Sequence, residues 1–137
     1  MRLALAFGLG IIAAGLAGSA LAQGPGFAKP DLVLQQTVEG LPEGARPLVR
    51  VLTASFKPGD RTVPHTHRFP VTVYVLEGAF TLELDGRAPI VVKAGEAMVE
   101  PPDVAMTGYN RSATETTRVV IFYVSAPDTP FLDPLHH

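Results

Sequence analysis

The chain has 137 residues, a length that fits one domain. Its 11 basic and 13 acidic residues give a net charge of −2, and this balance excludes a basic nucleic-acid-binding protein. There is no cysteine, which excludes a disulfide scaffold, a thiolate zinc site and a cysteine nucleophile.

The N-terminal residues 1–22 are typical of a secretory signal peptide. Arg2 provides a positive start, Leu3–Gly18 is an uncharged apolar run, and residues 20–22 read Ala-Leu-Ala, the small-x-small pattern that signal peptidase cleaves. We expect cleavage between Ala22 and Gln23, which predicts an exported mature protein, periplasmic or extracellular, with no membrane segment. A transmembrane anchor is the alternative, but the run is short for a span and contains several glycines.

The mature chain is predicted to begin with a leader, residues 23–45, that is rich in Gly and Pro at its start and contains a first strand at Asp31–Val38. Residues 46–125 then hold short segments rich in β-branched and aromatic residues, separated by Gly, Pro and Asp. The predicted strands of this domain are Leu48–Phe56, Val71–Leu76, Phe80–Leu84, Ile90–Lys93, Ala97–Glu100, Val104–Tyr109 and Thr117–Ser125. Residues 126–137 are expected to form a C-terminal tail.

This succession predicts an all-β protein. About eight short strands at close, regular spacing are typical of a sandwich or a barrel. No segment has convincing helical periodicity, and 13 prolines also argue against long helices.

Two histidines, His65 and His67, are the most informative residues for function. On a strand, residues two apart point to the same face, so both imidazoles would meet in the lumen of a barrel. Two convergent imidazoles are the core of many transition-metal sites. Because His-x-His is a short pattern, a pair of exposed histidines, or a pair stacked on carboxylates, is the alternative interpretation.

The flanking sequence resembles a known family. Residues 59–78, from Gly59 to Gly78, are similar to the first motif of the cupin superfamily, G-x5-H-x-H-x(3,4)-E-x6-G. Residues 95–110 are similar to the second motif, G-x5-P-x-G-x2-H-x3-N, with Gly95, Pro101 and Asn110 in place. The resemblance covers residues 46–125. It implies a double-stranded β-helix, a jelly-roll barrel of about eight short strands, and it makes a homodimer plausible.

The same resemblance implies a metal site, with two departures. A typical metal-bearing cupin holds one divalent ion with two histidines, a glutamate and a third histidine. His65 and His67 match the first two, Val71 (or Thr72 with the other spacing) stands in the glutamate position, and Met106 stands in that of the third histidine. We therefore expect a site of His65, His67 and Met106. Lacking a carboxylate and gaining a soft thioether, it would favour copper, above all Cu(I), over Mn(II) or Fe(II). Met106 as core packing is the alternative.

Other polar residues are weaker candidates. Glu100 and Asp103 flank a Pro-Pro turn, where either could supply a carboxylate at the barrel mouth, but solvated loop acids are the expectation. Asp103 also stands where the second motif has glycine. Tyr109 is expected to point away from Met106. His136 and His137 could return as ligands, although a mobile terminus is the expectation.

Three classes of function remain open. The first is an exported protein that binds a transition metal or a small ligand in its barrel. The second is a metal-dependent enzyme of oxygenase or isomerase type, and the third is a non-catalytic structural or interaction barrel. Fold alone does not separate them. We rank metal or ligand binding first, because the missing glutamate and the lack of a second catalytic cluster disfavour an enzyme.

Overall fold

The computed structural model describes Gly26 and residues 28–136. The predicted signal peptide and its cleavage site lie outside these residues. The fold lies in one of the two units into which the chain divides, Asp31–His137. Within the described residues there is no helix of the length and apolarity needed to cross a membrane.

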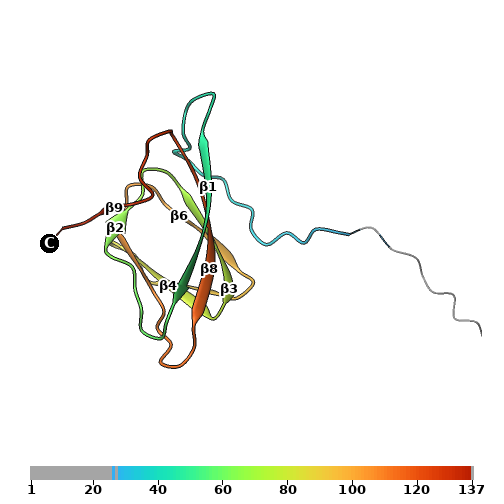
Figure 1. Cartoon of the computed structure of the whole chain (residues 1–137), viewed down its shortest axis with the longest axis vertical. Helices are drawn as coiled ribbons and strands as arrows, with labels where there is room; N and C mark the ends of the chain where they lie inside the picture. Colours follow the sequence, from blue (N-terminus) through green and yellow to red (C-terminus); the bar gives the residue numbers. More distant parts are fainter. Residues whose placement is uncertain (1–25, 27, 137) are drawn as a thin grey trace, which may run out of the picture. The chain divides into compact units, whose positions relative to one another are not determined.

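Nine short strands make up the secondary structure of the described part, which contains no helix (Figure 1). They are β1 Leu48–Phe56, β2 His65–Thr66, β3 Val71–Glu77, β4 Ala79–Leu84, β5 Ile90–Lys93, β6 Ala97–Glu100, β7 Met106–Tyr109, β8 Thr117–Ser125 and β9 Asp133–Pro134. The prediction of an all-β chain is confirmed.

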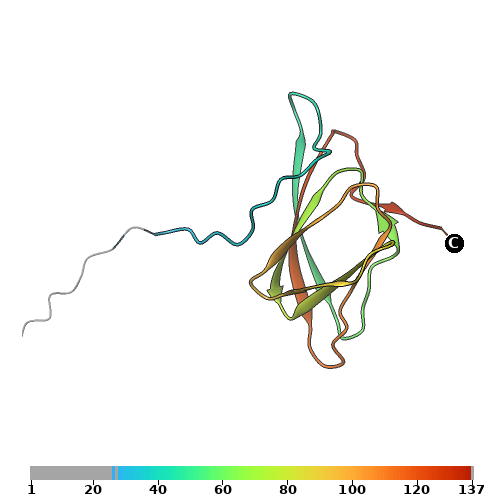
Figure 2. The same cartoon turned by 180° about the vertical axis from the view of Figure 1, so that it is seen from behind.

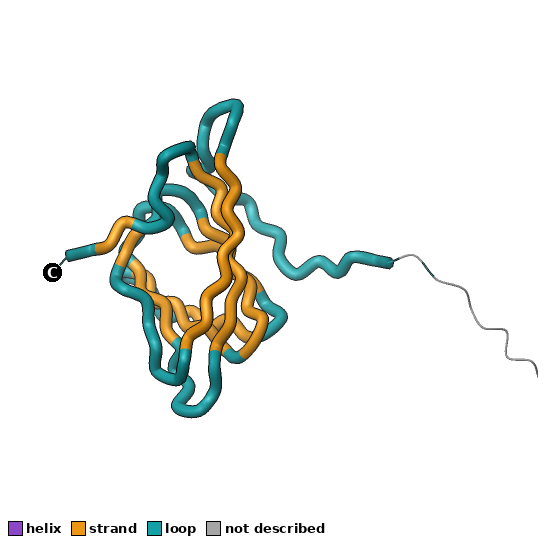
Figure 3. The backbone as a smooth tube through the Cα atoms, in the orientation of Figure 1, coloured by secondary structure: helices purple, strands orange, loops and turns teal. Residues whose placement is uncertain are grey.

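The strands form two antiparallel sheets that curve around a common interior (Figures 2 and 3). One sheet has the order β1-β8-β3-β6 and the other has the order β5-β4-β7-β2-β9. Chain neighbours are rarely sheet neighbours, so the chain crosses repeatedly between sheets, as in a jelly roll.

Alternation along the strands places the core between the sheets. In β3 the side chains of Val71, Val73 and Val75 are buried, whereas Thr72 and Tyr74 between them are partly exposed. The buried hydrophobic residues are Phe56, Val71, Val73, Val75, Phe80, Leu82, Leu84, Val92, Met98, Met106, Val119 and Tyr123.

The two ends of the chain differ from the sequence-based expectation. The prediction of a strand at Asp31–Val38 is wrong: these residues have strand-like composition, but they belong to no ladder, and a strand requires a neighbour to share its hydrogen bonds. Conversely, the segment predicted as a tail contributes β9. There Pro134 pairs with His65 and Asp133 pairs with Thr66.

Asn110 ties three segments of the barrel together. Its side chain is 2% exposed, and its Nδ2 group donates to the carbonyl oxygens of Phe56, Lys57 and Glu115 at 3.0, 3.1 and 2.8 Å. Its Oδ1 accepts from the backbone N–H of Ser112. One amide therefore satisfies backbone groups at the end of β1 and in the segment before β8.

Gly78, the single residue between β3 and β4, provides a test of this packing. It has a φ of +72°, and a Cβ added there would lie 2.6 Å from the Thr116 carbonyl oxygen. Gly86 has a φ of +70°, but a Cβ added there would have no heavy atom of the described residues within 4 Å, its own chain neighbours aside. We expect Gly86→Ala to cost about 1–2 kcal/mol of unfolding free energy and Gly78→Ala about 3 kcal/mol or more, because only Gly78→Ala adds a clash. Urea denaturation measures both, and equal losses would contradict the close approach.

Candidate metal centre

The two histidines of the His-x-His pattern lie inside the barrel. His65 begins β2 and is 4% exposed, and His67 follows this strand and is 1% exposed. The backbone N–H of Asp103 donates to the carbonyl oxygen of His67 at 2.8 Å, so the turn between β6 and β7 holds the main chain of His67 in place.

A hydrogen bond to a backbone carbonyl fixes the tautomer of each imidazole. His65 Nδ1 lies 2.7 Å from the carbonyl oxygen of Val63, and His67 Nδ1 lies 2.7 Å from that of Phe131. A carbonyl oxygen only accepts hydrogen bonds, so each Nδ1 must carry the hydrogen. In the neutral form, both Nε2 atoms therefore present lone pairs.

These lone pairs converge on each other and on a carboxylate. The two Nε2 atoms are 3.1 Å apart, and His67 Nε2 lies 3.3 Å from Oε2 of Glu100. With both imidazoles neutral and Glu100 ionised, none of these three atoms has a hydrogen to donate. Their mutual repulsion is relieved when a metal ion is shared among them.

Glu100 is the candidate residue whose position sequence reasoning misjudged. It is 5% exposed and is the last residue of β6, so the expectation of a solvated loop acid is wrong. Its backbone partner across the β3–β6 ladder is Val71, the residue in the family's glutamate position. The adjacent strand β6 therefore places a carboxylate beside His67, where β3 has none. Alternation was the available signal, since Glu100 shares a face of β6 with buried Met98.

The two donor pairs at His67 have the spacing of ligands on one transition-metal ion. Two atoms each about 2.1 Å from one ion, at angles of 90–110°, lie roughly 3.0–3.4 Å apart. Both distances at His67, 3.1 Å to His65 and 3.3 Å to Glu100, fall within this range. As the side chains stand, however, no group of three or more His, Cys, Asp or Glu residues in 26 and 28–136 is arranged to hold a metal ion.

The remaining sequence candidates lie elsewhere. Met106 is 2% exposed, belongs to the core and pairs across the ladder with His65, but it does not line the cavity beside the imidazoles. Asp103 is exposed and has a φ of 59°, a left-handed conformation that suits the glycine of the family motif. His136 is exposed, and His137 lies outside the described residues.

A cavity of about 110 Å³ borders the three converging side chains. Its wall is mostly apolar and includes three phenylalanine rings. The lining residues are Ala54, Phe56, Thr62, His65, His67, Val73, Phe80, Glu100, Gly108, Val119, Ile121, Phe131 and Leu132.

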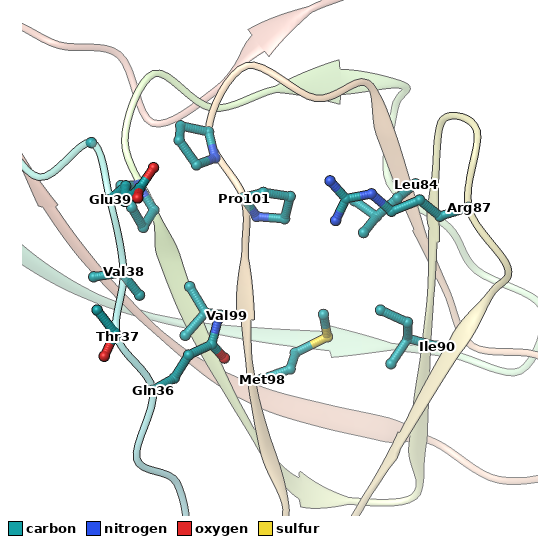
Figure 4. Close-up of a pocket in the computed structure, with 13 residues that line it drawn as sticks. Gln36, Thr37, Val38, Glu39, Leu84, Arg87, Ile90, Met98, Val99 and Pro101 are labelled. Carbon is teal, nitrogen blue, oxygen red and sulfur yellow. The ribbon is translucent and has the colours of Figure 1, made fainter.

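A larger hollow, of about 710 Å³, lies at the edges of β5 and β6 (Figure 4). Gln36–Glu39 border one side of it and Arg87 the other, with Met98 and Pro101 between them. Among the described residues that line it, the only ionisable side chains are Glu39 and Arg87. Both are exposed and face the hollow from opposite sides, so they form no cluster of reactive groups. The smaller cavity is therefore the better candidate for chemistry.

Comparisons with known proteins agree with this architecture. A protein-family model described as Cupin domain matches residues 52–123. Among solved structures, the chain is similar to an RmlC-like cupin from Shewanella frigidimarina, with 24% identity, a TM-score of 0.50, and coverage of 58% of this chain and 68% of that one. It is similar to a cupin-like protein from Thermotoga maritima, with 20% identity, a TM-score of 0.52, and coverage of 65% and 68%.

A third similar structure is the polyketide cyclase RemF from Streptomyces resistomycificus. The identity is 26% and the TM-score 0.53, and the match covers 69% of this chain and 64% of RemF. A search of curated proteins found no match.

The burial of His65 predicts a pH dependence of stability. Desolvation lowers the pKa of His65 below 6.5, and the nearby His67 lowers this pKa further. The hydrogen bond to Val63 and the charge of Glu100 oppose this shift without reversing it. As pH falls through the unfolded value, near 6.5, the unfolded chain takes up a proton that folded His65 resists, so the free energy of unfolding should fall. Urea denaturation of the chelator-treated protein between pH 8 and 5 measures it. His65→Asn should flatten the curve, and an unchanged slope would contradict the assignment.

Proposed function

We propose that this chain, which belongs to the cupin family, binds one divalent transition-metal ion in its barrel through His65, His67 and Glu100. The observation that carries the proposal is the convergence of three lone-pair atoms, two Nε2 atoms and one carboxylate oxygen, with no hydrogen to share. The pairs at His67 are at ligand spacing, and an ion would draw the carboxylate and the two imidazoles together around one point.

The proposed ligand set changes the preferred metal. Copper, expected from His65, His67 and Met106, depended on the absence of a carboxylate. Glu100 supplies that carboxylate, and two imidazoles with one carboxylate suit Zn(II), Fe(II) or Co(II) rather than soft Cu(I). A Cu(I) site with Met106 as the third ligand is the alternative that a metal titration separates from this one.

The residues around the ion have separate tasks in this proposal. The carbonyl groups of Val63 and Phe131 hold the Nδ1–H groups, which aim both imidazoles and raise their basicity as ligands. A bound ion of this kind supplies Lewis acidity toward an oxygen atom placed in the adjoining cavity.

A metal-dependent enzyme is the second candidate function. The observation that favours it is the cavity that adjoins the three polar groups, because a reacting molecule could sit there within reach of them. RemF, a similar protein of the same fold, is a polyketide cyclase. Catalysis would need such a molecule to fit the cavity, which holds about 110 Å³.

Substitution of Glu100 tests the metal proposal. Glu100→Gln keeps the size of the side chain and removes its charge, so we expect Zn(II) and Co(II) affinity to fall at least tenfold. Glu77→Gln, at an exposed position on β3, is the matched control and should bind like the parent. Metal titrations with a competing chelator measure the affinities. Unchanged binding by Glu100→Gln would remove Glu100 from the site.

Met106→Leu is measured in the same titration with Cu(I) and Zn(II). The swap keeps volume and apolarity, so folding should change by less than about 1.5 kcal/mol. We expect both affinities to stay at the parent value. A selective loss of Cu(I) binding would instead favour the copper site with His65, His67 and Met106.

We also propose that the protein is exported, with residues 1–22 as the signal peptide. The support is the sequence order of Arg2, an apolar run and a small-x-small site. Mass analysis of the protein made in its native host should show a mature N-terminus at Gln23. A full-length chain retained in the membrane fraction would identify the segment as an anchor.

A further inference from the structure

The cavity beside the three polar groups is small enough to restrict what it can hold. Its volume is about 110 Å³. At the packing density of a protein interior, about 0.74, this space takes about five or six non-hydrogen atoms. For comparison, an engineered apolar cavity of about 150 Å³ in another protein stays dry and binds benzene.

The wall of the cavity is a poor environment for water. The rings of Phe56, Phe80 and Phe131 line it, together with aliphatic side chains. Phe80 is in close contact with Gly108, where an added Cβ would lie 2.4 Å from the ring, so the backbone of β7 and this ring define one side of the space. Water needs two to four polar partners, and an apolar molecule would therefore fill most of this volume better.

The polar groups of the cavity accept hydrogen bonds. The Nε2 atoms of His65 and His67 present lone pairs, and Glu100 adds a carboxylate. Among the described residues that line the cavity, the only other polar side chain is Thr62, whose hydroxyl accepts from the backbone N–H of Gly108. A hydroxyl group would donate to these acceptors. A ligand carboxylate would meet the charge of Glu100 at close range in a low-dielectric interior, which is unfavourable.

We propose that the barrel cavity binds a short, uncharged alcohol of about four or five carbons, with its chain against the phenylalanine rings and its hydroxyl at His65, His67 and Glu100. The inference rests on the proposed function for the identity of the polar groups. It goes further by naming the ligand class, and it applies to the metal-free protein as well.

A homologous series of alcohols tests the inference. The chelator-treated mature protein, from Gln23 to His137, is titrated with ethanol, 1-butanol, 1-pentanol and 1-octanol. Binding is followed by NMR at the histidine rings and at the amide of Gly108. Affinity should rise about three- to fourfold per methylene up to 1-butanol or 1-pentanol and then fall. Butanoate should bind at least tenfold more weakly than 1-butanol. A steady rise through 1-octanol, or butanoate binding as tightly as 1-butanol, would overturn the proposal.

Cavity-filling variants locate the binding. Ala54→Leu adds three carbon atoms to the wall and should abolish 1-butanol binding, and the smaller Ala54→Val should weaken it at least fivefold if the larger change prevents folding. Thr53→Leu, an exposed neighbour on the same strand, is the matched control and should bind like the parent. Binding that survives in a folded Ala54 variant would place the alcohol elsewhere.

Zn(II) titration of the same samples separates this inference from the proposed function. Alcohol binding without zinc binding removes the metal proposal and leaves the cavity assignment intact. Zinc binding without alcohol binding removes the cavity assignment alone.

Discussion

Two hydrogen bonds to backbone carbonyl groups determine the character of the barrel interior. By fixing the hydrogen on each Nδ1, the carbonyl oxygens of Val63 and Phe131 leave both Nε2 atoms as acceptors that face each other. Phe131 reaches His67 only because the C-terminal segment returns to β2. The β2–β9 pairs and two hydrogen bonds between Arg68 and Asp133 hold that segment in place. Residues more than sixty positions apart therefore create the tautomer on which the site depends.

Burying three ionisable side chains inside the barrel is energetically unfavourable. His65, His67 and Glu100 are each 5% exposed or less, and buried ionisable groups are unfavourable unless they are paired. The three atoms that face one another, two Nε2 atoms and one carboxylate oxygen, carry no hydrogen, so a metal ion is the partner that would make their burial tolerable. A structural core would gain more from apolar side chains of similar size. Retaining three polar groups here is therefore an argument for binding over a purely structural barrel.

Sequence patterns anticipated the strands better than the site. Strands such as Thr117–Ser125 carry their own signal, a run of β-branched and aromatic residues, and the structure places β8 at those bounds. Alternation along β6 indicates only that Glu100 is buried, because its proximity to His67 arises from the register that sets it opposite Val71. The sequence motif along β3 has no carboxylate at Val71. The carboxylate of Glu100 lies on the neighbouring strand β6, and only the pairing of the two strands brings it to this place. Similarly, β9 has only two residues and is a strand because β2 lies beside it.

The site and the cavity are connected through one residue. The carbonyl oxygen of Phe131 holds His67, while its ring lines the cavity and lies 5.1 Å from the imidazole of His67, measured between centroids. A molecule that pushed this residue aside would also release the Nδ1–H group of His67 and with it the fixed direction of Nε2. A molecule that fits without moving Phe131 leaves the acceptors aimed. The size of the space and the geometry of the polar groups are therefore one constraint, and ligands that exceed the cavity disturb the very groups that would bind them.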